Sequence, residues 1–275
     1  MTVYKQVKFF KYQGAGNDFI LFEDFNRKFK VEMSHHIPLL CHRNFGIGAD
    51  GVIILQPSLI ATTKMSIFNN DGGEADMCGN GLRCVVAHFK EKHVSVETKV
   101  GICLGENKEC DVFVTLPVTE IIMSPINLPN NQIGHLLNTG VPHLIIIVDK
   151  LEDPDFEIKA NALRNNKMFA PNGVNVSYIT TKNDAIYIRT YERGVEAETL
   201  ACGTACAAAV LVMRKYDKKR TSVYTVYPKS LNKLHFIFDS QERIWMSGPA
   251  KKVFQGEIQL SLDEKMKRKF STMRG

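Results

Sequence analysis

Two cysteines, Cys78 and Cys202, occur in closely similar sequence contexts. In each context a glutamate lies four residues before a Cys-Gly pair, and a small polar residue and an apolar, helix-like run follow the pair. The two contexts are separated by a little under half of the chain. Two thiols presented by two related halves can work on both faces of one carbon atom, one removing a proton and the other delivering one. The pattern therefore predicts inversion at carbon without a cofactor.

Each cysteine is expected to stand at the start of a helix. A thiol there lies close to unpaired backbone N–H groups and to the positive end of the helix dipole, which lowers its pKa below the reference value of about 8.5. The glycine that follows lets the backbone approach a ligand, and the same N–H groups can bind a carboxylate. We therefore expect each site to bind an α-carboxylate, stabilise developing charge and accept a proton.

The remaining cysteines are interpreted as small buried apolar residues. A structural zinc site is the alternative, but neither the pair Cys78 and Cys84 nor the pair Cys202 and Cys206 has the short C-x₂-C spacing of such sites. The sequence therefore predicts no metal. The residues assigned to the core are Cys41, Cys84, Cys103, Cys110 and Cys206.

The segment 46–51 matches the G-x-G-x-x-G pattern of dinucleotide-binding loops. Such a loop needs a strand before it and a helix after it. Here a strand-like run, residues 52–55, follows instead, so we predict a turn and no nucleotide cofactor.

The cysteine contexts belong to a longer internal repeat. Further segments of the first half correspond, in the same order and at nearly constant spacing, to segments of the second: Gly14 to Gly140, 48–54 to 173–179, and 65–69 to 188–192. The period is too long for a solenoid and predicts two similar domains.

Both halves consist mainly of β-branched and aromatic stretches bounded by Gly, Pro and Asn, which predict strands. The expected strands are 7–12, 19–22, 52–55, 64–68, 94–98 and 111–116, then 135–137, 144–148, 176–180, 185–190, 222–227, 233–238 and 243–247.

One helix is expected after each reactive cysteine. The first carries apolar residues Leu82, Val85, Val86 and Phe89 at helical spacing. The second, residues 205–213, is apolar on every side, as expected for a helix buried within a surrounding sheet. Prolines and asparagines predict an irregular domain junction over residues 124–131.

Composition supports two domains in a reducing compartment. At 275 residues, 44% hydrophobic and 23% charged, the chain has the composition of a soluble globular protein and is long for a single core. It contains neither an apolar run of the ~18 residues that span a membrane nor a signal-peptide core. Seven scattered cysteines argue against a disulfide framework and for the cytoplasm.

The net charge of +6 is concentrated in residues 214–220 and in a tail over residues 265–274. A nucleic-acid surface would interleave aromatic residues with these charges, and apart from Tyr216 and Phe270 they are missing. We therefore expect neither a nucleic-acid nor a membrane partner, but a small-molecule substrate.

Taken together, these segments resemble the diaminopimelate epimerase family. The motifs that carry the resemblance are residues 14–19, 68–74, 78–84, 142–143, 191–194 and 201–204, spread in the expected order over about residues 7–258. The resemblance implies an α/β (α+β) fold of two pseudo-symmetric domains. Each is a β-barrel-like sheet rolled around a central helix, and the active site lies in the interdomain cleft. The domains would be residues 1–123, completed by a closing segment near 250–275, and residues 124–249.

The resemblance also implies an activity and the residues that perform it. The enzyme would interconvert LL- and meso-diaminopimelate without a cofactor, for lysine synthesis and bacterial peptidoglycan, as a cytoplasmic homodimer. Cys78 and Cys202 would be the two acid/base thiols, and His143 and Glu192 their polar partners. The reacting amino-acid end would be held by Asn17, Gly79, Asn80, Gly203 and Thr204, and the distal end by Asn69, Asn175, Glu192 and Arg193.

Three departures from the family pattern concern the distal end of the substrate. Val141 replaces an Asn common before Pro-His, Gly51 stands where some members have a Gln, and the loop over 194–199 is one residue longer. A site that loses a hydrogen-bonding group rejects analogues less strictly. We therefore expect broader specificity, including glutamate.

Two alternatives stay open from the sequence. One is another two-cysteine racemase of the proline or hydroxyproline type, although Arg193, with Asn69 and Asn175, favours a substrate with a second polar head. The other is a catalytically silent scaffold with the same fold.

Overall fold

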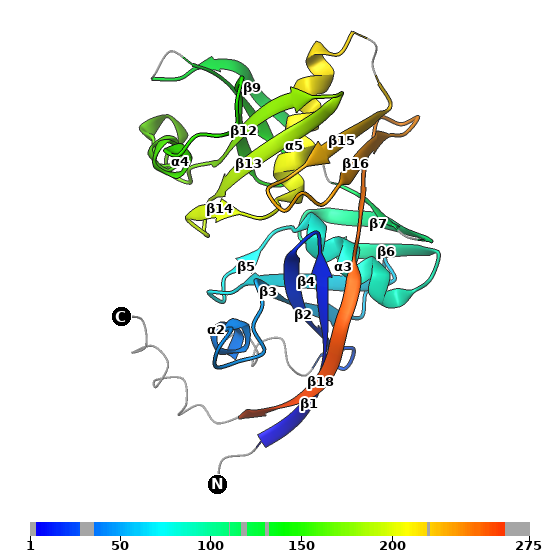
Figure 1. Ribbon diagram of the computed structural model, residues 1–275. Helices are drawn as coiled ribbons and strands as arrows, with labels where there is room; N and C mark the ends of the chain where they lie inside the picture. The colour runs from blue at the N-terminus through cyan, green and yellow to red at the C-terminus, as the bar shows by residue number, and fades with distance from the viewer. Residues whose placement is uncertain are drawn as a thin grey trace.

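A computed structural model of the chain describes residues 4–27, 36–109, 111–116, 120–129, 132–218 and 221–261. Cys110 and the basic tail over 265–274 lie outside these ranges. Two bodies follow one another along the chain, the first drawn below the second in Figure 1. No helix in the described ranges is both long and apolar enough to cross a membrane.

The two bodies have the same strand order. The strands of the first are β1 (Tyr4–Gly14), β2 (Asn17–Glu23), β3 (Gly51–Gln56), β4 (Thr63–Asn69), β5 (Glu74–Ala75), β6 (His93–Thr98), β7 (Gly101–Lys108) and β8 (Asp111–Thr115). Those of the second are β10 (Ile133–Asn138), β11 (Pro142–Ile147), β12 (Asn175–Lys182), β13 (Ala185–Glu192), β14 (Ala197–Thr199), β15 (Val223–Tyr227), β16 (Leu234–Phe238) and β17 (Ile244–Gly248).

Strands pair in the order β18-β1-β2-β3-β4-β6-β7-β8 in the first body, where β18 is Lys251–Ser261. The matching order in the second is β9-β10-β11-β12-β13-β15-β16-β17, where β9 is Glu120–Asn127. The parallel pairs occur at equivalent places in the two bodies. They are β2–β3 and β4–β6 in the first body, and β11–β12 and β13–β15 in the second. Strand β8 pairs with β17 and joins the bodies. The predicted repeat of two similar halves is confirmed.

Each sheet wraps around one central helix. Helix α3 (Gly79–Phe89) contacts β1, β2, β4, β6, β7 and β8, and helix α5 (Gly203–Tyr216) contacts β10, β11, β12, β13, β15 and β17. Strand β7 comes so close to α3 that a Cβ on Gly105 would lie 2.2 Å from a methyl group of Val86. Residues 205–210 of α5 are fully buried, as their uniformly apolar sequence predicts.

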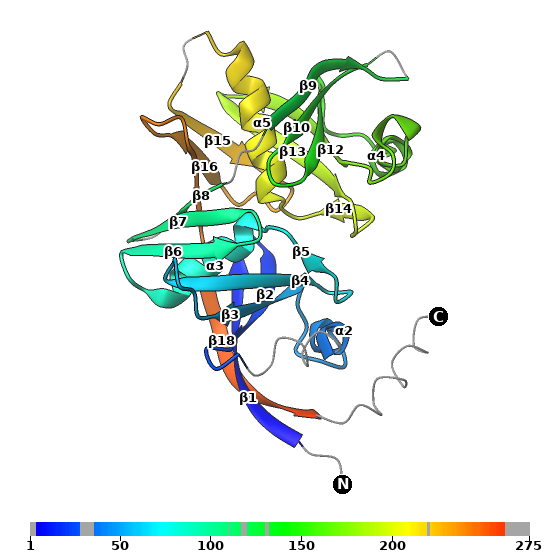
Figure 2. The same ribbon diagram turned by 180° about the vertical axis from the view of Figure 1, so that it is seen from behind.

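Shorter helices cover the outer faces of the sheets. Helix α2 (Ile37–Cys41) lies between β2 and β3 in the chain, and α4 (Phe156–Arg164), followed by the 3₁₀ turn η2 (Lys167–Phe169), lies between β11 and β12. Both lie on the same side of the molecule (Figure 2). In β3, Ile53 joins the core around α3 whereas Val52 packs with α2. Because both faces of β3 are covered, its sequence is a continuous apolar run without alternation.

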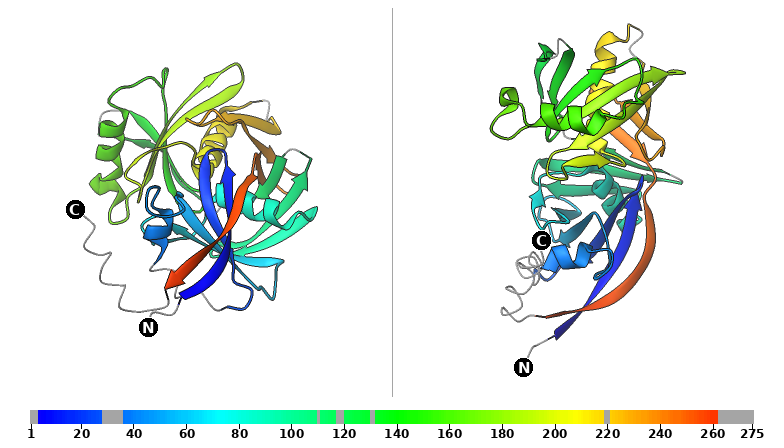
Figure 3. Two further views of the ribbon diagram at one scale, coloured as in Figure 1. Left: turned by 60° about the horizontal axis from the view of Figure 1, so that its bottom comes forward. Right: turned by 60° about the vertical axis from the view of Figure 1, so that its left-hand side comes forward.

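The structure differs from the sequence-based prediction at the expected irregular junction. Residues 120–127 form β9, which runs along β10, so the first part of the predicted junction is a strand. Pro125 has no N–H to donate, and the ladder shifts register between Gly134 and Leu136, opposite this part of β9. The closing strand β18 runs antiparallel to β1, and the pair curves away from the rest of the molecule (Figure 3).

Candidate active site

The two cysteine-bearing helices begin next to one another. Cys78 and Cys202 are the N-cap residues of α3 and α5. A Cβ on Gly79 would lie 2.6 Å from the methyl group of Met246, and one on Gly203 would lie 3.3 Å from the same group. Met246 in β17 therefore packs against the first residue of both helices, at the junction of the two bodies.

Cys78 is held by groups of the first body. Its Sγ accepts a hydrogen bond from the N–H of Gly81 at 3.4 Å, which caps the helix. The Sγ also lies 3.8 Å from Oδ1 of Asn17, and the same oxygen accepts a hydrogen bond from Nδ2 of Asn80 at 3.3 Å. The amides of Asn17 and Asn80 thus line the surroundings of this thiol.

Cys202 is held by groups of the second body. Its Sγ lies 3.4 Å from Oγ1 of Thr204, which is 3.0 Å from Nε2 of His143 in β11. Glu192, at the end of β13, accepts a short hydrogen bond from Thr199, and its charge acts on the Cys202 thiol. Nδ1 of His143 is buried and has no partner among the described residues. The structure therefore connects His143 to Cys202 through the Thr204 hydroxyl.

Burial dominates the ionisation of these groups. It raises the pKa of Cys78 to about 11, although the N–H groups of Gly81 and Asn80 act in the opposite direction. Burial, and next the negative charge of Glu192, raise the pKa of Cys202 well above its usual value. The expectation of lowered thiol pKa values is wrong for both cysteines, because the cost of desolvating a thiolate exceeds the stabilisation from the helix N-terminus.

The two polar partners of the thiols are also affected by burial. Burial, and next the charge of Arg193, lower the pKa of His143 to about 3, so its imidazole is neutral near pH 7. Burial raises the pKa of Glu192.

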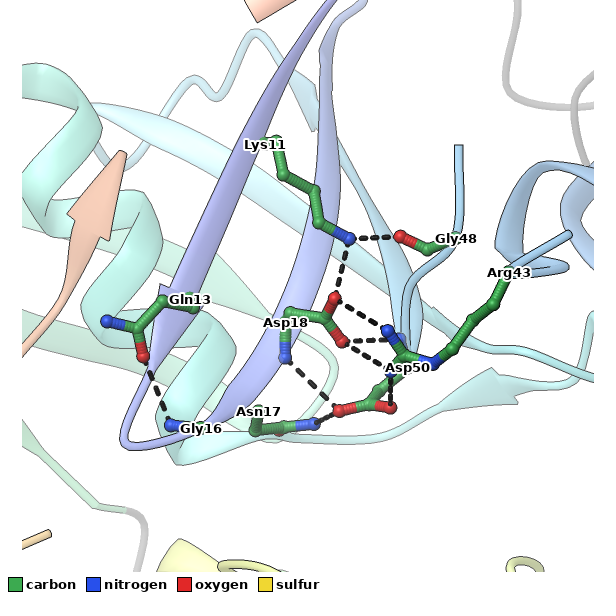
Figure 4. A network of polar contacts seen from close by, with 8 residues as sticks. All are labelled: Lys11, Gln13, Gly16, Asn17, Asp18, Arg43, Gly48 and Asp50. Atoms are coloured by element: carbon green, nitrogen blue, oxygen red, sulfur yellow. Dashed lines mark hydrogen bonds and ion pairs between the residues drawn. The ribbon is translucent and has the colours of Figure 1, made fainter. Parts of the chain in front are cut away.

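A charged network orients Asn17 (Figure 4). Nδ2 of Asn17 donates to Oδ2 of Asp50 at 2.8 Å. Asp50 is paired at 2.8 Å with Arg43, which also bonds Asp18 at 2.9 Å. Lys11, almost fully buried, completes the network by an ion pair with Asp18 and a short hydrogen bond to the carbonyl of Gly48. With Nδ2 held by Asp50, the Oδ1 of Asn17 is directed to Cys78 and Asn80.

Of the residues expected at the distal end of the substrate, some lie close to His143 and one does not. Asn175 is buried at the start of β12, in register with His143, and its Oδ1 accepts the N–H of Arg193 at 2.8 Å. Asn69 is exposed at the end of β4, and the contacts that the structure shows for it are made by its backbone in the turn to Gly73. The structure thus brings Asn175 and Arg193 to His143, whereas it shows no side-chain contact between Asn69 and the other candidate residues.

Three residues of this site were missed by the sequence-based reasoning. Met246 had no signal, because it is one apolar residue of a strand. Asp50 lies in the segment 46–51, for which the sequence predicts only a turn. Arg83 had a signal, a charged residue beside the apolar stripe of its helix, and its side chain is fully buried. Among the described residues, no group of three or more His, Cys, Asp and Glu side chains is arranged to hold a metal ion.

The fold is shared by solved structures of a phenazine biosynthesis protein and of a hydroxyproline epimerase. A phenazine biosynthesis protein of the PhzF family from Enterococcus faecalis matches with a TM-score of 0.72 and 16% identity, covering 93% of this chain and 100% of that one. A hydroxyproline epimerase from Agrobacterium vitis, with bound trans-4-hydroxy-L-proline, matches with a TM-score of 0.69 and 14% identity, covering 96% of this chain and 94% of that one. At these identities the likeness defines the fold class alone.

Sequence comparison defines the family. The diaminopimelate epimerase model matches residues 9–113 and 135–253. The diaminopimelate epimerase of Methanocella arvoryzae is 38% identical over 92% of this chain and 97% of its own length, and that of Chlorobaculum tepidum is 37% identical over 90% and 99%. The chain belongs to the diaminopimelate epimerase family, and is therefore an isomerase of the amino-acid epimerase class.

Proposed function

We propose that the enzyme interconverts LL- and meso-diaminopimelate by proton transfer between two thiols. The observation that carries the proposal is the meeting of two cysteine-capped helices, α3 and α5, against the single side chain of Met246. Each cysteine has its own polar partners, Asn17 for Cys78 and Thr204 with His143 for Cys202. In the proposed complex, each thiol faces one side of a bound α-carbon.

The proposed reaction moves one proton off the α-carbon and another onto it. A thiolate on one cysteine takes the α-proton, and the electron pair of the C–H bond stays on the carbon, delocalised into the α-carboxylate. The thiol of the other cysteine donates its proton to the opposite face and becomes the thiolate. The N–H groups at the starts of α3 and α5 stabilise the carboxylate as its charge grows.

We propose the binding roles that the family resemblance implies. Gly79, Asn80, Gly203 and Thr204, at the helix starts, hold the reacting end together with Asn17. Asn175, Glu192 and Arg193 hold the distal end, with Asn69 on the exposed rim. Arg193 suits a distal carboxylate, because a guanidinium can pair with both of its oxygens.

Exchange of the α-proton tests the proposal. The protein is incubated with LL-diaminopimelate in D₂O under reducing conditions, and deuterium at the α-carbon is followed by mass spectrometry. We expect exchange in the wild type, none in Cys78→Ala or Cys202→Ala, and wild-type exchange in Cys103→Ala, a buried cysteine of β7. Exchange on proline or hydroxyproline but not diaminopimelate favours the racemase alternative, and no exchange on any of these favours a silent scaffold.

We also propose that the site accepts substrates with a shorter distal end. Val141 lies in the turn that carries Gly140, whose Cβ would lie 3.7 Å from Met77, the residue before Cys78. The longer loop over 194–199 is fixed by Glu196, which pairs with Arg164 of α4 at 2.9 Å. An apolar side chain in this turn removes one hydrogen bond to the distal end. Glutamate is therefore expected to exchange its α-proton slowly, and absence of exchange at high enzyme concentration argues against broadened specificity.

We propose two domains, one of residues 1–123 completed by residues 250–275 and one of residues 124–249, with β9 at the junction. We also propose that the protein is a cytoplasmic homodimer. It would serve lysine synthesis and, in bacteria, peptidoglycan synthesis. The described cysteines are free, which suits a reducing compartment. Sedimentation of the purified protein distinguishes a dimer from a monomer.

A further inference from the structure

Arg83 is a buried arginine with neutral hydrogen-bond acceptors. Its side chain lies in the first turns of α3 and is fully buried. One terminal nitrogen donates to Oδ1 of Asn80 at 2.9 Å, and the other lies 3.2 Å from Sδ of Met246. Its Nε has no partner among the described residues. A guanidinium in such surroundings is costly, because burial removes its hydration and no acceptor carries a full charge.

The ionisable groups that act on Arg83 are mainly thiols, which burial keeps uncharged near pH 7 by raising their pKa values. In order of their effect on its ionisation, its electrostatic neighbours are Cys84, Cys78 and Cys206, followed by Asp111. Burial and the charge of Glu192 raise the pKa of Cys78, the N–H groups of Gly81 and Asn80 lower it, and the charge of Arg83 lowers it to a smaller extent. Of these three thiols, Cys78 is the one placed where proton transfer to substrate would occur. A thiolate on Cys78 would thus give the buried guanidinium a counter-ion.

Arg83 also determines which way the Asn80 amide points. A guanidinium has only donors, so the group of Asn80 that faces it must be the oxygen. Nδ2 of Asn80 is then free to donate to the carbonyl of Ala201 at 3.0 Å and to Asn17 at 3.3 Å. One of these acceptors precedes Cys202 and the other contacts Cys78. Loss of the guanidinium would leave the orientation of the Asn80 amide unfixed, and this amide bonds residues next to both cysteines.

We propose that Arg83 is a positioning residue of the reaction, which holds the Asn80 amide between the two cysteine segments and supplies the buried positive charge that balances a thiolate on Cys78. Its function in turnover rests on the proposed epimerisation, whereas its effect on the Cys78 thiol does not. The two roles are separable, because lysine keeps the charge but lacks the planar fork of arginine.

The test compares Arg83→Met and Arg83→Lys by the rate at which iodoacetamide alkylates Cys78 between pH 6 and pH 10, read by peptide mass spectrometry. For Arg83→Met we expect the profile to move to higher pH and the rate at pH 8 to fall about threefold, equivalent to about half a unit in thiol pKa. For Arg83→Lys we expect a profile close to wild type, but a lower kcat and higher KM for epimerisation.

Arg214 provides the matched control. It also lies on a central helix, α5, and its NH1 is buried without a partner in the described chain, but it is in the last turn, far along the helix from Cys202. Arg214→Met and Arg214→Lys should lower Tm and leave the alkylation profile of Cys78 unchanged.

Two outcomes overturn the proposal. One is an Arg83→Met variant whose Cys78 alkylation profile superimposes on that of the wild type. The other applies if Arg83→Met does not fold. In that case an Arg83→Lys variant with wild-type kcat and KM but a lower Tm would show that Arg83 is a purely structural residue. Alkylation needs no turnover, so failure of the wild type to exchange diaminopimelate would count against the proposed function and not against the effect of Arg83 on the thiol.

Discussion

Asn80 on helix α3 donates a hydrogen bond of 3.0 Å to the carbonyl of Ala201, the residue before Cys202. This bond connects residues of the two bodies at the point where both central helices begin. Through Asn80 and Asn17, the segment that carries Cys202 is joined to the surroundings of Cys78. The two thiols therefore belong to one hydrogen-bonded assembly, and changes in that assembly should affect both.

The hydroxyl of Thr204 is predicted to connect His143 to Cys202. Thr204→Val keeps the shape of the side chain but leaves Nε2 of His143 and Sγ of Cys202 without their shared partner. We expect kcat to fall about tenfold to a hundredfold, since a hydrogen bond to a group that becomes charged contributes about 1.5–3 kcal/mol. Steady-state kinetics in both directions measures the effect.

Thr190→Val is the control for this change. Thr190 is also buried, and in the described part of the chain its hydroxyl bonds Ser177 at 3.0 Å and not a thiol or an imidazole. It should cost about 1 kcal/mol of unfolding free energy and leave kcat unchanged. An unchanged kcat in Thr204→Val would show that His143 does not act through this hydroxyl.

Asp50 is predicted to position Asn17. In Asp50→Asn the new amide can present an N–H to Nδ2 of Asn17, and the ion pair with Arg43 is lost. The Asn17 amide is then no longer held with its oxygen toward Cys78, so we expect KM to rise and kcat to fall, together lowering kcat/KM about tenfold or more. Asp153→Asn, which alters a surface pair with Lys159, is the matched control. Equal kinetics in the two variants would contradict the positioning role.

Catalysis is predicted to increase with pH. The free enzyme needs one thiolate, and burial holds the pKa of Cys78 at about 11 and that of Cys202 well above its usual value. Below these values the thiolate fraction grows about tenfold per pH unit, so kcat/KM should rise from pH 7 to pH 9. No inflection is expected near pH 6.5, because the pKa of His143 is lowered to about 3. A flat profile from pH 7 upward would show that the thiols ionise more easily than their burial implies.

Much of this fold was readable from the sequence, because its repeat preserves local patterns. Both central helices follow a cysteine and carry distinct apolar patterns, and most strands are β-branched runs between turn residues. Strand β9 was missed because Pro125 is a residue that usually interrupts strands. The ladder between β9 and β10 accommodates the proline by a shift in register. Strand β7 was missed because glycine and polar residues interrupt its alternation of apolar and polar residues. Gly105 lacks a side chain where Val86 of α3 packs against the strand.

Long-range contacts explain what the sequence could not show at the site. The high thiol pKa values arise from burial by both bodies, which no local segment reveals. The contact of Met246 with Gly79 and Gly203 joins residues far apart in the chain, and a strand methionine has nothing to distinguish it. Thr204 was expected to bind substrate, but its link to His143 depends on how β11 lies against α5.

Stability should also depend on the protonation of His143. Its folded-state pKa is lowered to about 3, against about 6.5 in the unfolded chain, so below pH 6.5 the unfolded chain binds a proton that the folded protein does not. This group therefore leaves stability unaffected above pH 6.5 and reduces it as the pH falls, by about 1.4 kcal/mol per unit between pH 6.5 and pH 3. Urea unfolding at pH 7.5 and pH 5.5 should show a smaller loss in His143→Leu than in the wild type, whereas the exposed control His93→Gln should lose as much as the wild type. Equal losses in all three proteins would mean that His143 is protonated, or becomes exposed, in the folded state at pH 5.5.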